Sequence, residues 1–268
     1  RDSVIGEING SAGIKPVKVS EDVFKLIQVG KMYSELADGS FDITIGPLSN
    51  LWRIGFPDAR KPHQTEIDDV LPLIDYKAIE LNEGEQTVYL TKENMQLDLG
   101  AIAKGFITDE IVSSLKANGV TTAVIDLGGN IYVLGDSPQS NDHWDVGIQD
   151  PFESRGEIVG KIRVKNQSIV TSGVYERNLE VDGEVFHHLL NPETGYPYDN
   201  DVAGVTVVTD HSTDADALST ILFGKGIEAG LAYVEATDGV EAIFISHDKE
   251  VYTTSGIESH FELTNDQF

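Results

Sequence analysis

The stretch Thr122-Ala-Val-Ile-Asp-Leu-Gly-Gly-Asn-Ile-Tyr-Val-Leu134 carries the clearest information on the fold. Two runs of β-prone residues flank the turn Gly128-Gly129-Asn130, and this arrangement predicts a hairpin. Further β-type runs follow at 144–148 and 157–164. The middle of the chain is therefore expected to form an antiparallel sheet.

Helices and strands are expected on both sides of this hairpin, without regular alternation. Ser20 followed by two acidic residues predicts a helix over 21–38 that ends before Gly39. A second helix, with Ile107, Ile111 and Leu115 on one face, is expected to end at Asn118-Gly119. The other expected strands are 78–81, 87–90, 202–208, 242–246 and 250–254, and the other expected helices are 215–223 and 227–235. This order predicts the α+β class, with residues 1–268 as one domain.

Composition limits the classes of function. The 268 residues are 40% hydrophobic, which is enough apolar material for one large domain or two small interlocked ones. The 45 acidic and 19 basic residues give a formal charge of -26, which disfavours nucleic acid and anionic bilayers as partners. An anionic ligand would need a local metal ion or lysine to offset this charge.

The absence of certain residues and segments excludes further classes. The chain has no cysteine, so disulfides, thiolate-bound zinc and a cysteine nucleophile are ruled out. No apolar run approaches the ~20 residues of a membrane span. The chain begins at Arg1 without a methionine or an apolar signal segment, and we interpret this start as a processed or engineered boundary.

The segment Gly100-Ala-Ile-Ala-Lys104-Gly105 is a candidate anion site. It combines small residues, a lysine and an expected helix start, and an anion needs the backbone N–H groups and the cation that these provide. The alternative is a tight strand-to-helix turn with a solvated lysine. The glycine-rich motifs of Rossmann and Walker nucleotide sites are absent.

The segment 213–220 is a candidate metal site. Asp216 and Thr220 stand at i and i+4, so one helix face would offer a carboxylate and a hydroxyl. Hard oxygen donors of this kind suit Mg²⁺. The alternative is that Asp214 caps the helix and Asp216 is a first-turn residue that favours the helix dipole.

His187 and His188 precede a turn built from Asn191-Pro-Glu-Thr-Gly-Tyr-Pro197. An imidazole can exchange protons near neutral pH. Adjacent residues of a strand point to opposite faces, so only one of the two histidines can enter a given site. The alternative is a structural histidine, just as Trp52, Trp144 and Phe41 are interpreted as core residues.

Six segments, in this order along nearly the whole chain, resemble the ApbE-type FAD:protein FMN transferases, once described as thiamine-biosynthesis lipoproteins. The segments are Phe41-Asp-Ile-Thr-Ile-Gly-Pro-Leu-Ser-Asn-Leu-Trp52, Leu97-Asp-Leu-Gly-Ala-Ile-Ala-Lys-Gly-Phe106, Asp126-Leu-Gly-Gly-Asn130, Ser172-Gly-Val-Tyr-Glu-Arg177, His188-Leu-Leu-Asn-Pro-Glu-Thr-Gly195 and Asp214-Ala-Asp-Ala-Leu-Ser-Thr220. The resemblance implies two interlocked halves of T-fold-like type, with mainly antiparallel sheets and FAD in a cleft between them.

The same resemblance implies roles for single residues. His188 would deprotonate the acceptor hydroxyl, and Asp216 would be the second catalytic residue. The FAD contacts would be Ser40, Phe41 and Asp42 at the adenosine, with Asp98, Lys104 and Leu190 elsewhere. The Mg²⁺ ligands would be the backbone carbonyl of Ala101 together with Asp216, Ser219 and Thr220.

The activity implied is Mg²⁺-dependent transfer of FMN from FAD to a threonine or serine hydroxyl of a target flavoprotein, with release of AMP. Acceptors would be subunits of electron-transfer complexes or extracellular flavoproteins. The location implied is outside the cytoplasmic membrane, on a lipid anchor whose cysteine this chain lacks. Two alternatives are an Mg²⁺-dependent FAD pyrophosphatase that gives FMN and AMP, and a non-catalytic FAD-binding lipoprotein.

The chain departs from the family pattern at two places. An N-terminal Ser-Thr-Tyr segment and the serine-containing run after it are reduced to Asp2-Ser-Val-Ile-Gly-Glu-Ile-Asn9. An aromatic residue and a methionine that help to enclose FAD are therefore absent. Asn191 replaces a common aspartate, a change that should preserve the turn more readily than any ionic role.

Overall fold

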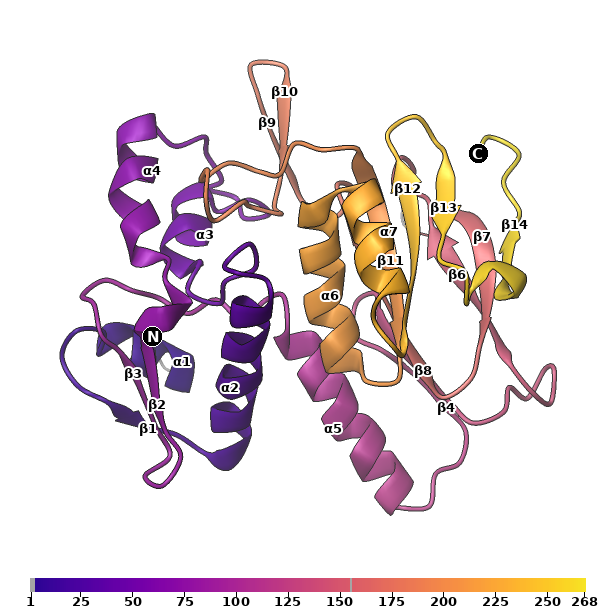
Figure 1. Cartoon of the computed structure of the whole chain (residues 1–268), viewed down its shortest axis with the longest axis horizontal. Helices are drawn as coiled ribbons and strands as arrows, with labels where there is room; N and C mark the ends of the chain where they lie inside the picture. The colour runs from indigo at the N-terminus through magenta and orange to yellow at the C-terminus, as the bar shows by residue number, and fades with distance from the viewer. Residues whose placement is uncertain (1–2, 155) are drawn as a thin grey trace. The chain divides into compact units, whose positions relative to one another are not determined.

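The structure, a computed structural model, describes residues 3–154 and 156–268 (Figure 1). The chain forms two compact units, and each is built from two separate stretches of sequence. Unit 1 consists of Arg1–Gly100 and Glu176–Tyr198, and unit 2 consists of Ala101–Tyr175 and Asp199–Phe268. The helices and antiparallel sheets confirm the α+β class. The assignment of residues 1–268 to one domain stays a prediction.

Unit 1 combines short helices with two small antiparallel sheets. Its helices are α1 (Val4–Gly10), α2 (Glu21–Leu36), α3 (Gly46–Trp52) and α4 (Gln64–Val70), followed by the 3-10 turns η1 (Leu71–Leu73) and η2 (Tyr76–Ala78). Its strands are β1 (Val17–Lys18), β2 (Ile79–Asn82), β3 (Thr87–Leu90), β9 (Asn178–Val181) and β10 (Glu184–His187). The first sheet has the order β1-β3-β2, and β9 and β10 form a hairpin.

The elements of unit 1 begin and end where local chemistry requires. The Ser20 hydroxyl accepts a hydrogen bond from the N–H of Val23, and Glu21 and Asp22 follow in the first turn of α2. This confirms the expected helix, which ends at Leu36, two residues before the expected end. The expected β2–β3 hairpin is also confirmed. Sequence patterns did not predict α1, α3, α4 or the β9–β10 hairpin, because each is short and stabilised mainly by packing.

Trp52 is the centre of one hydrophobic cluster in unit 1. Its side chain is fully buried, and its Nε1–H donates to the carbonyl of Gly195 at 2.9 Å. Its ring lies 5.3 Å from the ring of Phe186 and 5.7 Å from that of Tyr196. The contact joins α3 to the 176–198 stretch, so it closes unit 1 across 143 positions of sequence.

Replacing Trp52 by phenylalanine removes the Nε1–H donor. The buried Gly195 carbonyl then loses its hydrogen bond, and the smaller ring leaves a void. We expect the free energy of unfolding to fall by about 2–4 kcal/mol, measured by urea denaturation. Trp144 is a matched control because its Nε1–H donates to the Gly135 carbonyl at 3.0 Å in a half-exposed position, where water can replace the lost bond. Equal losses in Trp52→Phe and Trp144→Phe would contradict the importance given to the buried contact.

Unit 2 is built on a six-stranded antiparallel sheet of order β13-β12-β11-β8-β5-β4. The strands are β4 (Ala123–Asp126), β5 (Asn130–Leu134), β8 (Gln167–Gly173), β11 (Val202–Thr209), β12 (Val240–Ser246) and β13 (Val251–Thr253). A second sheet, of order β14-β7-β6, is formed by β6 (Trp144–Gln149), β7 (Ile158–Val164) and β14 (Phe261–Leu263) after the 3-10 turn η3 (Glu258–His260). The helices are α5 (Ala103–Ala117), α6 (Ser212–Lys225) and α7 (Ile227–Glu235).

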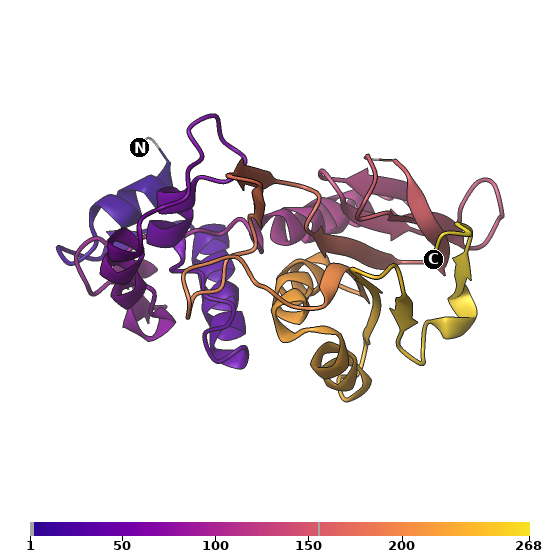
Figure 2. The same ribbon diagram turned by 90° about the horizontal axis from the view of Figure 1, so that it is seen from above.

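The large sheet of unit 2 is covered on both faces. On β5, Val133 packs into the core shared with β6 and β7, whereas Tyr132 and Leu134 pack with residues of α5. This alternation follows from the two-residue period of a strand. All residues of β11 are buried, as expected for a strand with both faces covered. Figures 1 and 2 show α6 and α7 side by side next to this sheet.

The hairpin predicted from residues 122–134 is confirmed as β4 and β5, which pair in antiparallel register. The expected apolar stripe of the second helix is wrong in part, because Ile107 is 49% exposed. The residues buried on α5 are Gly105, Thr108 and Val112. The physical reason is that α5 turns a small-residue face toward α6.

Helix α6 begins at Ser212, three residues before the expected start. No helix among the described residues is both long enough and apolar enough to span a bilayer.

Candidate functional site

The expected site residues are divided between the two units, and each group is described within its own unit. Unit 1 contains Ser40, Phe41, Asp42, Asp98, His188 and Leu190. Unit 2 contains Ala101, Lys104, Asp216, Ser219 and Thr220. The FAD cleft between two halves stays a prediction.

In unit 1, backbone bonds hold Asp98 beside the 40–43 segment. The N–H of Asp98 donates to the carbonyl of Ile43 at 2.8 Å. The Asp98 carboxylate accepts from the Ser49 hydroxyl at 2.7 Å and from the Gly100 N–H at 2.9 Å. Two of the expected FAD-contacting segments are therefore neighbours within the same unit.

Asp42 and Phe41 face the interior of unit 1. The Asp42 carboxylate accepts from the N–H and hydroxyl of Thr44, at 2.8 and 2.7 Å, and from the N–H of Tyr76 at 3.0 Å. Burial raises the pKa of this carboxyl, and the same hydrogen bonds oppose that shift. Phe41 is buried as well, as expected of a core residue, and its contact with FAD stays a prediction. Of the expected adenosine segment, only Ser40 has an exposed side chain.

The two adjacent histidines have different environments. His187, the last residue of β10, has its Nε2 at 2.8 Å from the carbonyl of Tyr198, and its Nδ1 accepts from the N–H of Leu189 at 3.2 Å. Because Nδ1 is an acceptor here, the proton of the neutral ring resides on Nε2. Both ring nitrogens of His187 are thus engaged within unit 1. His188 follows β10, and its backbone N–H donates to the carbonyl of Arg177 at 3.2 Å. Its role as the base stays a prediction.

The turn after His188 retains its geometry with asparagine. The Asn191 side chain accepts from the N–H of Glu193 at 2.9 Å, and its backbone N–H donates to the Tyr196 carbonyl at 2.8 Å. An aspartate would accept the first of these bonds equally well, so the expectation that the turn is preserved is confirmed. Leu190 is buried in the Trp52 cluster.

Tyr198 ties this turn to the 40–42 segment. Its hydroxyl donates to the carbonyl of Ser40 at 2.6 Å. Burial, and secondarily the Glu193 carboxylate, raise the pKa of Tyr198 to about 12. The hydroxyl therefore keeps the proton that it donates throughout the neutral range.

In unit 2, the Asp216 carboxylate meets the start of α5. The side chain is 5% exposed, and its Oδ2 accepts from the N–H of Gly105 at 2.8 Å. The Ser219 hydroxyl donates to the backbone carbonyl of Asp216 at 2.9 Å and accepts from Ser172 at 2.8 Å. Ala101 lies in the turn that precedes α5. The structure thus brings the Asp216 carboxylate to the segment that contains Lys104.

Gly105 makes this approach possible. A Cβ atom on Gly105 would lie 2.3 Å from the carbonyl oxygen of Ser212 and 2.8 Å from the Cβ of Asp216. The glycine lies inside α5, which begins at Ala103, and not in the tight turn of the alternative interpretation. Its physical role is close helix-to-helix contact.

Asp109 has a structural role that the sequence patterns did not identify. Its carboxylate accepts from the N–H groups of Ser212 at 2.7 Å and Thr213 at 2.8 Å, and so caps α6 from another helix. The alternative in which Asp214 caps α6 is wrong, because the cap position is His211 and Asp214 lies in the first turn. A cap supplied from 103 positions away leaves no local pattern in the sequence.

The oxygen donors around Asp216 fit magnesium. No group of three or more His, Cys, Asp and Glu side chains suited to a metal ion occurs within residues 3–154 and 156–268. Mg²⁺ is usually held by one or two carboxylates, with water and substrate phosphates completing its octahedron. The expected set, which is one buried carboxylate with two hydroxyls and a backbone carbonyl, has the chemistry that this requires. Zinc sites are more often built from Cys and His ligands.

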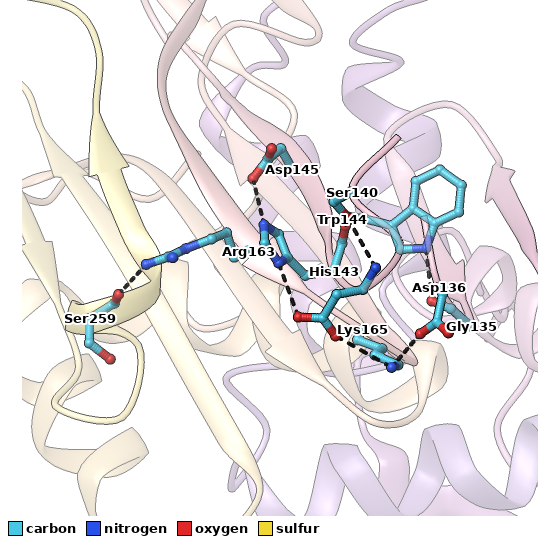
Figure 3. A network of polar contacts seen from close by, with 10 residues as sticks. Gly135, Asp136, Ser140, His143, Trp144, Asp145, Arg163, Lys165 and Ser259 are labelled. Atoms are coloured by element: carbon cyan, nitrogen blue, oxygen red, sulfur yellow. Dashed lines mark hydrogen bonds and ion pairs between the residues drawn. The ribbon is translucent and has the colours of Figure 1, made fainter. Parts of the chain in front are cut away.

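A pocket of about 610 Å³ in unit 2 is lined by none of the expected site residues. Figure 3 shows polar contacts beside it: Lys165 pairs with Asp136 and Asp142, and His143 lies 3.5 Å from Asp142 and 3.7 Å from Asp145. These contacts hold the loop before β6. They account for the charged side chains locally, so we assign this network to structure.

Replacing Gly105 by alanine should force α5 away from α6. We expect a loss of about 1–3 kcal/mol in the free energy of unfolding, measured by urea denaturation. Gly10→Ala is the matched control, because no atom lies within 4 Å of the added Cβ there. A Gly105→Ala protein as stable as the Gly10→Ala protein would show that the two helices are not in close contact.

Known proteins provide an independent comparison. A family model described as the ApbE family matches residues 1–244. The chain is 40% identical to an FAD:protein FMN transferase of Klebsiella pneumoniae, over 95% of this chain and 78% of that protein. It is 37% identical to an FAD:protein FMN transferase of Treponema pallidum, over 100% of this chain and 77% of that protein.

Solved structures agree with these sequence relatives. The ApbE protein of Thermotoga maritima superposes with a TM-score of 0.86 at 30% identity, over 96% of this chain and 83% of that one. The apo form of the flavinyl transferase ApbE of Pseudomonas stutzeri superposes with a TM-score of 0.82 at 27% identity, over 98% of this chain and 82% of that one.

Proposed function

The chain belongs to the ApbE family and is an FAD:protein FMN transferase, and we propose that it uses Mg²⁺, acts on a threonine or serine hydroxyl and releases AMP. The observation that carries the proposal is the hydrogen bond from Gly105 N–H to the Asp216 carboxylate. This bond holds the buried Asp216 carboxylate, a group that can bind a metal ion, at the start of α5, where Lys104 lies. A pyrophosphate is bound by N–H groups and a cation, and a hard oxygen ligand suits the Mg²⁺ that would accompany it.

The residues of unit 2 bind and orient the FAD pyrophosphate in this proposal. Asp216, Ser219, Thr220 and the carbonyl of Ala101 would hold Mg²⁺, which when bound would offset the charge of the phosphates. Lys104 adds a second positive charge. Such charge compensation matters in a chain with a formal charge of -26.

The residues of unit 1 supply the base in this proposal. His188 takes the proton from the acceptor hydroxyl, and the hydroxyl oxygen forms a bond to the FMN-side phosphorus. The bond from that phosphorus to the oxygen bridging to AMP breaks, and AMP leaves with the electron pair. FMN remains on the acceptor as a phosphoester. Both nitrogens of His187 are engaged within unit 1, so His187 is not the base in this proposal.

The acceptor and the location are proposals that rest on family membership. We propose flavoproteins as acceptors, either subunits of electron-transfer complexes or extracellular proteins, and a site of action outside the cytoplasmic membrane. A related reaction, in which water replaces the hydroxyl and FAD is hydrolysed to FMN and AMP, would use the same groups. Exclusion of water by the docked acceptor favours transfer.

Removing the Asp216 carboxylate tests the metal assignment. We expect Asp216→Ala to lower the Mg²⁺-dependent rate of FMN transfer by about 100-fold or more, as does EDTA added to the unsubstituted protein. Asp214→Ala is the matched control, because Asp214 is a neighbouring carboxylate on the same helix. If Asp216→Ala transfers FMN at the rate of Asp214→Ala, Asp216 is not a metal ligand.

Removing the His188 imidazole tests the base. We expect His188→Ala to lower the rate of transfer by about 10²–10⁴-fold, because an unassisted hydroxyl is a poor nucleophile. The control is His247→Ala, which removes an exposed imidazole in a turn of unit 2. Both rates would be measured as acceptor labelled with FMN. An undiminished rate in His188→Ala rules out the base assignment.

A further inference from the structure

We propose that His187 is a positioning residue that fixes the backbone on both sides of His188 and thereby sets the position from which the His188 side chain extends. The inference rests on the proposed function, because it assigns a role relative to His188 as the base. His187 itself touches neither FAD nor the acceptor in this proposal. It acts through the hydrogen bonds that its ring makes within unit 1.

The ring of His187 connects the two ends of the loop that follows it. Its Nδ1 accepts from the N–H of Leu189 at 3.2 Å, two residues along the chain. Its Nε2 lies 2.8 Å from the carbonyl of Tyr198, eleven residues along the chain. The N–H of Tyr198 in turn donates to the Leu189 carbonyl at 2.9 Å. One imidazole therefore joins the outgoing and returning strands of the loop.

His188 lies between the two residues that this ring connects. Its own N–H donates to the carbonyl of Arg177 at 3.2 Å. The N–H of the next residue, Leu189, is held by the side chain of the preceding residue, His187. The backbone dihedral angles of His188 are thus restrained from both sides, and the position of its Cβ follows from them.

Tyr198, at the C-terminal end of this loop, is also held by a hydrogen bond. The Tyr198 hydroxyl donates to the Ser40 carbonyl at 2.6 Å. His187 therefore restrains His188 relative to the 40–42 segment of unit 1, and not only relative to a free loop. A displacement of ~1 Å at a reacting group can cost about 100-fold in rate.

The two hydrogen bonds require one chemical form of His187. The neutral ring with its proton on Nε2 can accept from Leu189 and donate to Tyr198 at the same time. A proton on Nδ1, in either the other tautomer or the imidazolium ion, would place a donor against the Leu189 N–H. His187 is therefore suited to positioning and unsuited to accepting a proton at this place.

Two substitutions separate the two hydrogen bonds. His187→Asn keeps an acceptor for the N–H two residues on, in the geometry of an Asx-turn. His187→Gln keeps a donor that can reach the Tyr198 carbonyl but loses the Nδ1 acceptor, and His187→Ala loses both. The measurements are kcat for FMN transfer to an acceptor protein, the Kd for FAD, and the far-UV circular dichroism of each variant, with His247→Ala as the control.

We expect kcat to fall about 10–100-fold in His187→Ala and His187→Gln and only a few-fold in His187→Asn, with the Kd for FAD changed by no more than about twofold. The inference is overturned if His187→Ala keeps the kcat of the His247→Ala control, or if His187→Asn is as slow as His187→Ala. A loss of FAD affinity without a loss of kcat would overturn it too.

A spectroscopic measurement decides the case in which the variants do not fold. In the unsubstituted protein with ¹⁵N-labelled histidine, we expect the His187 ring to be neutral, with its proton on Nε2, at neutral pH. A proton on Nδ1 would overturn the inference. Failure of the proposed function appears separately, as an unsubstituted protein that transfers no FMN, and it leaves the tautomer measurement valid.

Discussion

The close approach of α5 to α6 at Gly105 is the constraint on which the arrangement of unit 2 depends. The missing side chain at this position allows the Ser212 carbonyl and the Asp216 Cβ to come where a Cβ atom would otherwise lie. The approach also brings Asp109 of α5 to the N-terminus of α6, where it satisfies two backbone N–H groups. Two carboxylates thus link the helices in opposite directions: Asp109 accepts from α6 and Asp216 accepts from α5. The segment with Lys104 is fixed as a result.

In unit 1, a loop and not a helix carries the candidate base. The chain from 187 to 198 contains two prolines and a glycine and has no regular secondary structure over most of its length. Three hydrogen bonds nevertheless hold it in place. The His187 ring contacts the Tyr198 carbonyl, Trp52 donates to the Gly195 carbonyl, and the Tyr198 hydroxyl donates to the Ser40 carbonyl. A catalytic group on such a loop can be as well positioned as one on a helix, because backbone and side-chain hydrogen bonds replace the missing ladder.

The sequence predicted the parts of this protein that depend on local pattern. The β4–β5 hairpin, α2 with its Ser20 cap and the asparagine turn at Asn191 all follow from signals a few residues long. The face of α5 was predicted in part wrongly, since Ile107 is apolar but exposed, while Gly105 and Thr108 are buried. Apolar periodicity could not reveal a contact made by small residues. Distant partners such as Asp109 with Ser212 leave no trace in local spacing. Lys104, Asp216, Thr220 and the histidine pair were candidates from residue chemistry alone. The other site residues came from resemblance to a family, and all of their roles are proposals.

In the proposed reaction, FMN is transferred from FAD to a protein hydroxyl and not to water. The most direct measurement incubates the protein with FAD, Mg²⁺ and a threonine-bearing flavoprotein acceptor, and compares the amount of AMP released with the amount of acceptor that gains the mass of FMN. We expect equal amounts of AMP and labelled acceptor, and neither product in EDTA. Release of AMP with no gain in acceptor mass, for each acceptor tried, would rule out transfer and favour hydrolysis of FAD.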